Sequence, residues 1–232
     1  MLNIEELLEE DRNAPLASPF RYGYQFDVDL SLQNSGGWIN LENGDRLWRL
    51  TIKSPGALAL FFKCDQFYLP DGAQLFVYNE DESTILGAYT NANNKPSMSF
   101  STSLIKGHII HLEYYEPYSV YNQGIISINA VIHDYRDLFN LTEKNRDEAC
   151  GYNVSCSESN GYELQVNATS YLDMNNGYIC SGTMLNNALN NYTAYYWTAW
   201  HCIHNVNPDD FEDFKFYFDY ETTNCENSSA NP

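Results

Sequence analysis

The sequence predicts an all-β protein in two parts, an antiparallel β-sandwich or jelly roll followed by a second β unit. Apolar and polar residues alternate in short runs along most of the chain, and turns rich in Gly, Asn and Pro separate these runs. Five of the six cysteines lie between residue 150 and the end of the chain. Many short strands are typical of sandwiches, and the uneven cysteines indicate a second, chemically different unit.

The first predicted domain covers residues 21–140. Its strand-like runs are 22–32, 47–52, 58–62, 75–78, 85–89, 109–115 and 125–132. An alternation with a period of two buries one face of each strand, and turn sequences such as Asn43-Gly44 and Pro70-Asp71-Gly72 lie between them. Residues 1–20, which open with a short helical pattern and break at Pro15, are expected to be an N-terminal segment of their own.

The second part begins after a polar segment, residues 141–149, which is the predicted linker. Residues 150–232 then return to β patterns. Strands are predicted near Glu163–Val166, Tyr178–Leu185, Ala194–Thr198 and Phe214–Tyr220. These strands are interleaved with the cysteines, so the second unit is expected to be held by disulfides.

Composition excludes several classes of partner. The formal net charge of −19 and the absence of a basic run argue against nucleic acid. No apolar stretch approaches the ~20 residues that a membrane span requires, and the acidic start lacks the pattern of an export signal. The cysteines lack paired Cys-x-x-Cys units, which favours disulfides in an oxidising compartment over a zinc site. A secreted protein is the expectation.

Two motifs carry chemistry. Residues 195–202, YYWTAWHC, place His201 and Cys202 at the end of an apolar strand, and residues 180–187, CSGTMLNN, form the strand before it. The first resembles the Thr-Ala-x-His-Cys signature of trypsin-like serine proteases. The second resembles the Cys-x-Gly-x-Leu-x-Asn strand of their bacterial lysyl endopeptidase branch. The resemblance covers about residues 145–225, and the preceding sandwich resembles the pro-region of such secreted precursors.

This resemblance implies a fold and a reaction. The second unit would be the N-terminal β-barrel half of a chymotrypsin-like protease, and His201 would be the general base of a Ser-His-Asp triad that hydrolyses peptide bonds, with a preference for Lys. No Gly-x-Ser-Gly sequence follows His201. None of the four aspartates that follow is expected to be the triad aspartate: Asp209, Asp210, Asp213 and Asp219. The chain is therefore expected to be a fragment that is inactive alone.

The resemblance also implies bridges and a processing site. It pairs Cys180 with Cys202 and Cys156 with Cys225, and it leaves Cys150 to a partner beyond residue 232. Cys64 matches no family bridge and is expected to be a buried thiol. Cleavage between the pro-region and the mature enzyme is expected after Lys144, with Arg146 as the competing site. The expected partners are a protein or peptide substrate, and the pro-domain with its own protease domain.

Other interpretations of these residues remain open. A histidine at a strand end is ordinarily structural, and this is expected of His108, His111, His133 and His204. His201-Cys202-x-His204 could form half of a metal site, but no second half occurs at a suitable spacing, so neither a metal nor a cofactor is expected. The alternative function is an extracellular β-sandwich for binding or adhesion with a degenerate protease-like remnant. An aspartate strand and a serine loop further along the chain would favour the enzyme.

Overall fold

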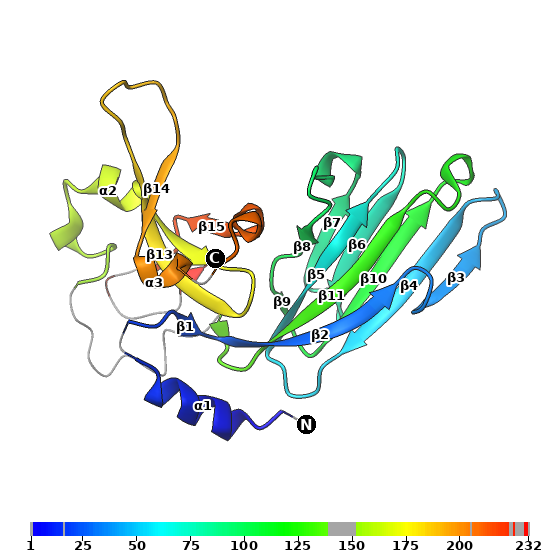
Figure 1. Ribbon diagram of the computed structural model, residues 1–232, viewed down its shortest axis with the longest axis horizontal. Coiled ribbons are helices and arrows are strands. Elements are labelled where there is room, and N and C mark those ends of the chain that lie inside the picture. Colours follow the sequence, from blue (N-terminus) through cyan, green and yellow to red (C-terminus); the bar gives the residue numbers. More distant parts are fainter. Residues whose placement is uncertain are drawn as a thin grey trace. The chain divides into compact units, whose positions relative to one another are not determined.

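A computed structural model describes residues 2–15, 17–138, 152–204, 206–222, 225 and 230–231. The chain divides into two compact units, one of residues 23–135 and one of residues 2–22 together with residues from 136 onward. The described residues contain much more strand than helix (Figure 1), which confirms the all-β class. The N-terminal segment expected over residues 1–20 thus belongs to the same unit as the cysteine-rich part. Short 3-10 turns are Asn91–Asn93, Tyr118–Val120, Ser157–Ser159 and Pro208–Asp213.

The first unit contains two antiparallel sheets. One has the order β3-β4-β10-β6-β7, with strands β3 (Gly37–Asn40), β4 (Arg46–Lys53), β10 (Ile109–Glu116), β6 (Gln74–Asn79) and β7 (Ile85–Tyr89). The other has the order β2-β11-β5-β8, and β9 also pairs with β5. Its strands are β2 (Gly23–Ser31), β11 (Ile125–Asp134), β5 (Ala59–Tyr68), β8 (Phe100–Ser101) and β9 (Ile105–Lys106).

The two sheets of the first unit share one core. Every second residue of β10 is buried, as the alternation in the sequence requires. Trp48 from β4 and Leu112 from β10 belong to the same apolar cluster as Phe62 from β5 and Ile128 from β11. Side chains of both sheets therefore meet in one interior, which makes this unit a β-sandwich.

The second unit is built on one antiparallel sheet of the order β1-β13-β12-β15, with β14 also paired to β13. The strands are β1 (Phe20–Arg21), β13 (Tyr178–Leu185), β12 (Thr169–Asp173), β15 (Lys215–Phe218) and β14 (Tyr195–Thr198). A separate pair joins β16 (Glu221–Thr222) to β17 (Ala230–Asn231). The helices are α1 (Ile4–Asn13), α2 (Glu163–Ala168) and α3 (Trp200–Ile203).

Two predictions for the second unit are wrong. The strand predicted near Glu163–Val166 is helix α2, because four residues with two apolar positions do not distinguish a short strand from one helical turn. The predicted barrel half is an open sheet within the described residues. There β15 pairs only with β12, so its other edge has no partner strand that would close a barrel.

Helix α1 begins and ends where its sequence requires. The side chain of Asn3 caps its first turn by accepting a hydrogen bond from the backbone N–H of Glu6, at 3.4 Å. Glu5 and Glu6 place negative charge at the N-terminus of the helix, where the helix dipole favours it. The helix ends before Ala14-Pro15, because the residue before a proline is disfavoured in the helical region.

His133, on β11, gives the sandwich a pH dependence. Its ring is buried, its Nδ1 lies 2.7 Å from Ser54 Oγ, and its Nε2 has no hydrogen-bond partner among the described residues. Burial lowers the pKa of His133, because it penalises the charged imidazolium. Below about pH 6.5 His133 is therefore protonated in the unfolded chain but still neutral in the folded sandwich. The folded state loses stability as the pH falls further.

We expect the free energy of unfolding of the sandwich to be lower at pH 5.5 than at pH 7.5, by up to about 1.4 kcal/mol for this one proton. Hydrogen exchange of the amides in β10, which has partner strands on both sides, measures it in the sandwich alone. The variant His133→Gln keeps a hydrogen-bonding group near Ser54 but does not titrate. An equal loss of stability in His133→Gln and in the parent chain would assign the pH dependence to other groups.

Candidate functional site

The hairpin of β13 and β14 positions the chain just before His201. The two strands pair antiparallel from Gly182–Thr198 to Leu185–Tyr195. A Cβ atom at Gly182 would lie 2.5 Å from the carbonyl oxygen of Trp197 and 2.5 Å from Cε1 of Tyr196. Only glycine permits this approach. The glycine of the CSG sequence thus lets β14 lie close against β13.

The turn after β14 is fixed by the residues of the Thr-Ala-x-His-Cys sequence. Thr198 Oγ1 donates a hydrogen bond to the carbonyl oxygen of Ser181, at 2.8 Å, and so ties the end of β14 to β13. Ala199 is extended, and its carbonyl accepts the N–H of Cys202 at 3.0 Å. The chain therefore turns directly from strand into the short helix α3, which carries His201.

A disulfide holds this turn against the sheet. Cys202 is buried and bonded to Cys180 of β13, with a Cα–Cα distance of 6.3 Å. Cys202 also belongs to the small apolar core of the unit, together with Leu172 and Met174. His201, one residue earlier, is only half-buried. The neighbouring cystine thus anchors α3 while the imidazole stays accessible.

His201 lines a pocket of about 980 Å³ within the second unit. The chain near the histidine contributes Cys202, His204 and Val206, and the end of β12 and start of β13 contribute Met174, Asn176 and Tyr178. The other lining residues come from the N-terminal segment and from Arg136. Those of the N-terminal segment are Glu10, Asp11, Arg12, Ala14, Pro15, Ala17, Ser18, Pro19, Phe20 and Arg21.

The described carboxylates that line this pocket are Glu10 and Asp11, and both are paired with Arg21. Asp210, Asp213 and Asp219 do not line it, and the side chain of Asp209 lies outside the described residues. A metal ion has no ligand set here either. His201 and the sulfurs of Cys180 and Cys202 lie within 4.8 Å of one another, but the two sulfurs are bonded to each other and offer no thiolate.

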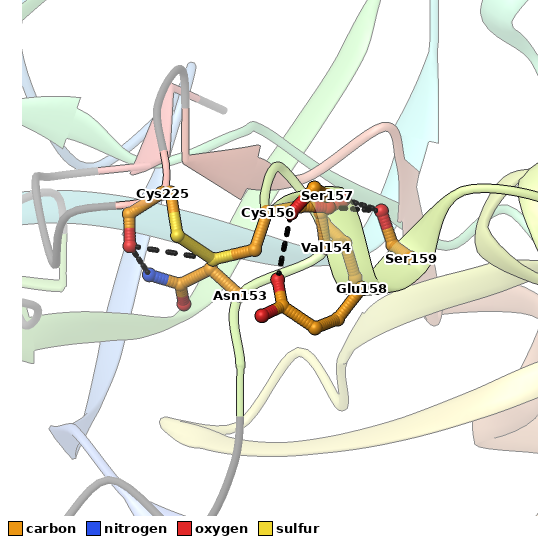
Figure 2. The surroundings of a disulfide bond; sticks show 7 residues. All are labelled: Asn153, Val154, Cys156, Ser157, Glu158, Ser159 and Cys225. Atoms are coloured by element: carbon orange, nitrogen blue, oxygen red, sulfur yellow. Dashed lines mark hydrogen bonds between the residues drawn. A yellow bond between two sulfur atoms is a disulfide. The ribbon is translucent and has the colours of Figure 1, made fainter.

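A second disulfide joins the start of this unit to its end. Cys156 is bonded to Cys225, with a Cα–Cα distance of 4.4 Å (Figure 2). Asn153 Nδ2 donates to the carbonyl oxygen of Cys225 at 3.2 Å, and Ser159 Oγ donates to that of Cys156 at 2.7 Å. These are the two cysteine pairs that the family resemblance implies. Cys64 is a buried thiol in the core of the sandwich.

Several residues singled out in the sequence lie elsewhere. Lys144, Arg146 and Cys150 are outside the described residues. His204 is exposed at the end of α3, and His108 is exposed in the sandwich. His111 Nδ1 lies 2.9 Å from Thr51 Oγ1 on the neighbouring strand, which gives this ring a structural contact.

The sequence did not indicate the contacts of the N-terminal segment with this site. Tyr22 OH donates to Asp173 Oδ1 at 3.3 Å, across 151 residues of sequence. Lys215 Nζ lies 3.9 Å from the other oxygen of Asp173. No local sequence pattern predicts the contact between Tyr22 and Asp173. Asp173 directly follows Tyr171 and Leu172, and nothing else in its neighbourhood distinguishes it.

A comparison with protein families finds a match in the second unit. Residues 144–232 match the family model described as Lysyl endopeptidase, C-terminal domain. The matched segment carries His201 and the four bridged cysteines. The match supports the lysyl endopeptidase family for this part of the chain, and with it a protease as the parent protein.

Two solved structures show a limited likeness. One is PliG from Aeromonas hydrophila, a periplasmic inhibitor of g-type lysozyme, at 9% identity and a TM-score of 0.21, covering 49% of this chain and 86% of that one. The other is an isomalto-dextranase of Arthrobacter globiformis T6 complexed with panose, at 11% identity and a TM-score of 0.20, covering 51% of this chain and 24% of that one. Such scores do not establish a shared fold.

Within the described residues, no helix is both long and apolar enough to cross a membrane.

Proposed function

We propose that this chain is the N-terminal part of a secreted serine endopeptidase precursor, in which His201 is the general base of the triad. The observation that carries the proposal is the half-buried imidazole at a pocket, on a short helix that a cystine fixes to the preceding strand. The family match over residues 144–232 supports it. The disulfides support an extracellular location.

His201 would activate a serine hydroxyl, which is a poor nucleophile until a neighbouring imidazole accepts its proton. The triad also requires a carboxylate that orients the ring and an oxyanion hole that stabilises the tetrahedral intermediate. In the proposed enzyme the serine and the aspartate come from chain beyond residue 232. A preference for Lys is carried over from the lysyl endopeptidase family.

The sandwich, residues 21–140 in the sequence division, is proposed to be the pro-domain of this zymogen and a partner of its own protease domain. Cleavage after Lys144, or after Arg146, would separate the two. This cleavage would leave the protease part of the chain beginning shortly before Cys150, with the Cys156–Cys225 bridge intact.

The test compares this chain with a product extended by the downstream coding sequence, on a lysyl ester substrate. We expect no hydrolysis by the 232-residue chain and hydrolysis by the extended product, whose mature form begins at Asn145 or Asp147. Hydrolysis by the short chain would show that the proposed division of the triad is wrong. An extended sequence without an aspartate strand and a Gly-x-Ser-Gly loop would favour the binding or adhesion module instead.

A further inference from the structure

The N-terminal segment pairs with part of one edge of β13, the strand before β14. Ile179 of β13 pairs with Asp173 on one side and with Phe20 of β1 on the other. Gly182 likewise pairs with Ser170 on one side and Thr198 on the other. Strands β1 and β14 therefore lie end to end along the same edge of β13. Without β1, the backbone groups at residues 178–179 would form an open strand edge.

Hydrogen bonds continue this pairing toward the centre of the unit. The N–H of Tyr22 donates to the carbonyl oxygen of Gly177 at 2.8 Å. The ring of Tyr22 is buried, and its hydroxyl reaches Asp173. Residues 20–22 thus dock as an added strand with one anchoring aromatic side chain, which is a common mode of peptide recognition.

Ion pairs tie helix α1 to this added strand. Asp11 accepts from Arg21 Nε through Oδ1 at 2.7 Å and from an Arg136 terminal nitrogen through Oδ2 at 2.7 Å. The three side chains are only 12–16% exposed. Arg21 also donates to the carbonyl oxygen of Leu7 at 3.0 Å. Charge-assisted pairs with so little exposure are less screened than surface pairs.

We propose that residues 4–15 and 17–22, the N-terminal strap, are a peptide ligand held in cis that restricts access to the histidine site. The strap pairs with the edge of β13 and contributes lining residues to the pocket that His201 also lines. An extended peptide substrate would bind the same edge once the strap has left. That the strap regulates an enzyme rests on the proposed function. The proposal assigns the inhibitory contact to this strap rather than to the sandwich.

The strap fits the proposed processing scheme. Cleavage after Lys144 or Arg146 would break the covalent link between the strap and the part of the chain that carries His201. Only the β1 pairing, the Tyr22 contact and the ion pairs would then hold the strap in place. A ligand of this kind dissociates at a rate that these contacts set. Weakening one ion pair should therefore expose His201 without unfolding the sheet.

The test uses the full chain and the rate at which diethyl pyrocarbonate acylates His201, mapped by peptide mass spectrometry. His108 is exposed in the sandwich and serves as the reference in the same molecule. The variant Arg21→Ala removes the pairs with Glu10 and Asp11. Arg49→Ala is the control, because it makes the same chemical change on β4 of the sandwich and Arg49 does not line the pocket.

We expect Arg21→Ala to raise the His201 rate relative to His108 by about tenfold, and Arg49→Ala to leave the ratio unchanged. A synthetic peptide of residues 2–22, added to Arg21→Ala, should restore the slow rate. Hydrogen exchange in β12 shows whether the variant is folded. If it is not, Tyr22→Phe, which removes only the hydroxyl contact with Asp173, takes its place.

The proposal about the strap would be contradicted if the ratio of the His201 and His108 acylation rates were unchanged in a folded variant. It would also be contradicted if the added peptide did not slow the acylation of His201. Neither measurement depends on hydrolysis, so the two proposals can fail separately. If the extended product has no esterase activity, the proposed function is wrong. If release of the strap nevertheless exposes His201 in that product, the proposal about the strap still holds.

Discussion

Replacing Cys156 and Cys225 together by serine is expected to lower the free energy of unfolding of the second unit by about 4 kcal/mol. The bridge joins residues 69 apart in sequence, whereas Cys180–Cys202 joins residues 22 apart. In the chain-entropy model a bridge destabilises the unfolded chain more when its loop is longer, so the shorter bridge is expected to contribute about 3 kcal/mol. Hydrogen exchange of the amides in β12 measures both losses, because this strand lies inside the sheet with partners on both sides.

The pair Cys180→Ser and Cys202→Ser is the matched comparison, since it makes the same chemical change in the same unit. Exchange in β10 of the sandwich should change in neither variant. A loss below about 1 kcal/mol on removing the Cys156–Cys225 bridge would contradict the prediction, because it would mean that this bridge barely restricts the unfolded chain.

The sandwich was largely predictable because its signal is local. In β10 the alternation over Ile109–Tyr115 matches the observed burial at each position. The longer strand β5 was predicted only in part: the predicted run, residues 58–62, covers its apolar start, whereas the exposed neighbours Asp65 and Gln66 interrupt the alternation in its second half.

Pairings between distant and very short segments were not predictable. Phe20 and Arg21 form only two residues of strand, and their partners lie near residue 179. Nothing in the sequence around them specifies that edge, because their pairing depends on where β14 leaves β13 uncovered. The membership of the N-terminal segment in the second unit follows from this tertiary contact.

The candidate site was predicted from motif residues rather than from periodicity. The strand-turn-His-Cys arrangement is present, and Gly182 has a packing reason that the motif alone does not give. The polar cluster of Tyr22, Asp173 and Lys215 was missed, because each of these residues looks like an ordinary strand or turn position in its own neighbourhood.

His201 is expected to be indispensable for catalysis in the extended enzyme. Loss of the general base of a triad lowers kcat by on the order of 10⁴- to 10⁶-fold, because the serine hydroxyl is then no longer deprotonated as it attacks. The fold should survive the substitution, since the imidazole is only half-buried and the adjacent cystine holds α3 in place.

The most direct test compares His201→Ala with Asp210→Asn in the extended product, by kcat/KM on a lysyl ester. Asp210→Asn is the control, because Asp210 is exposed, follows the histidine turn and does not line the pocket. Activity should fall on the order of 10⁴-fold or more in His201→Ala and stay within about twofold in Asp210→Asn. Comparable activity in His201→Ala and the parent enzyme would contradict a catalytic imidazole at this position.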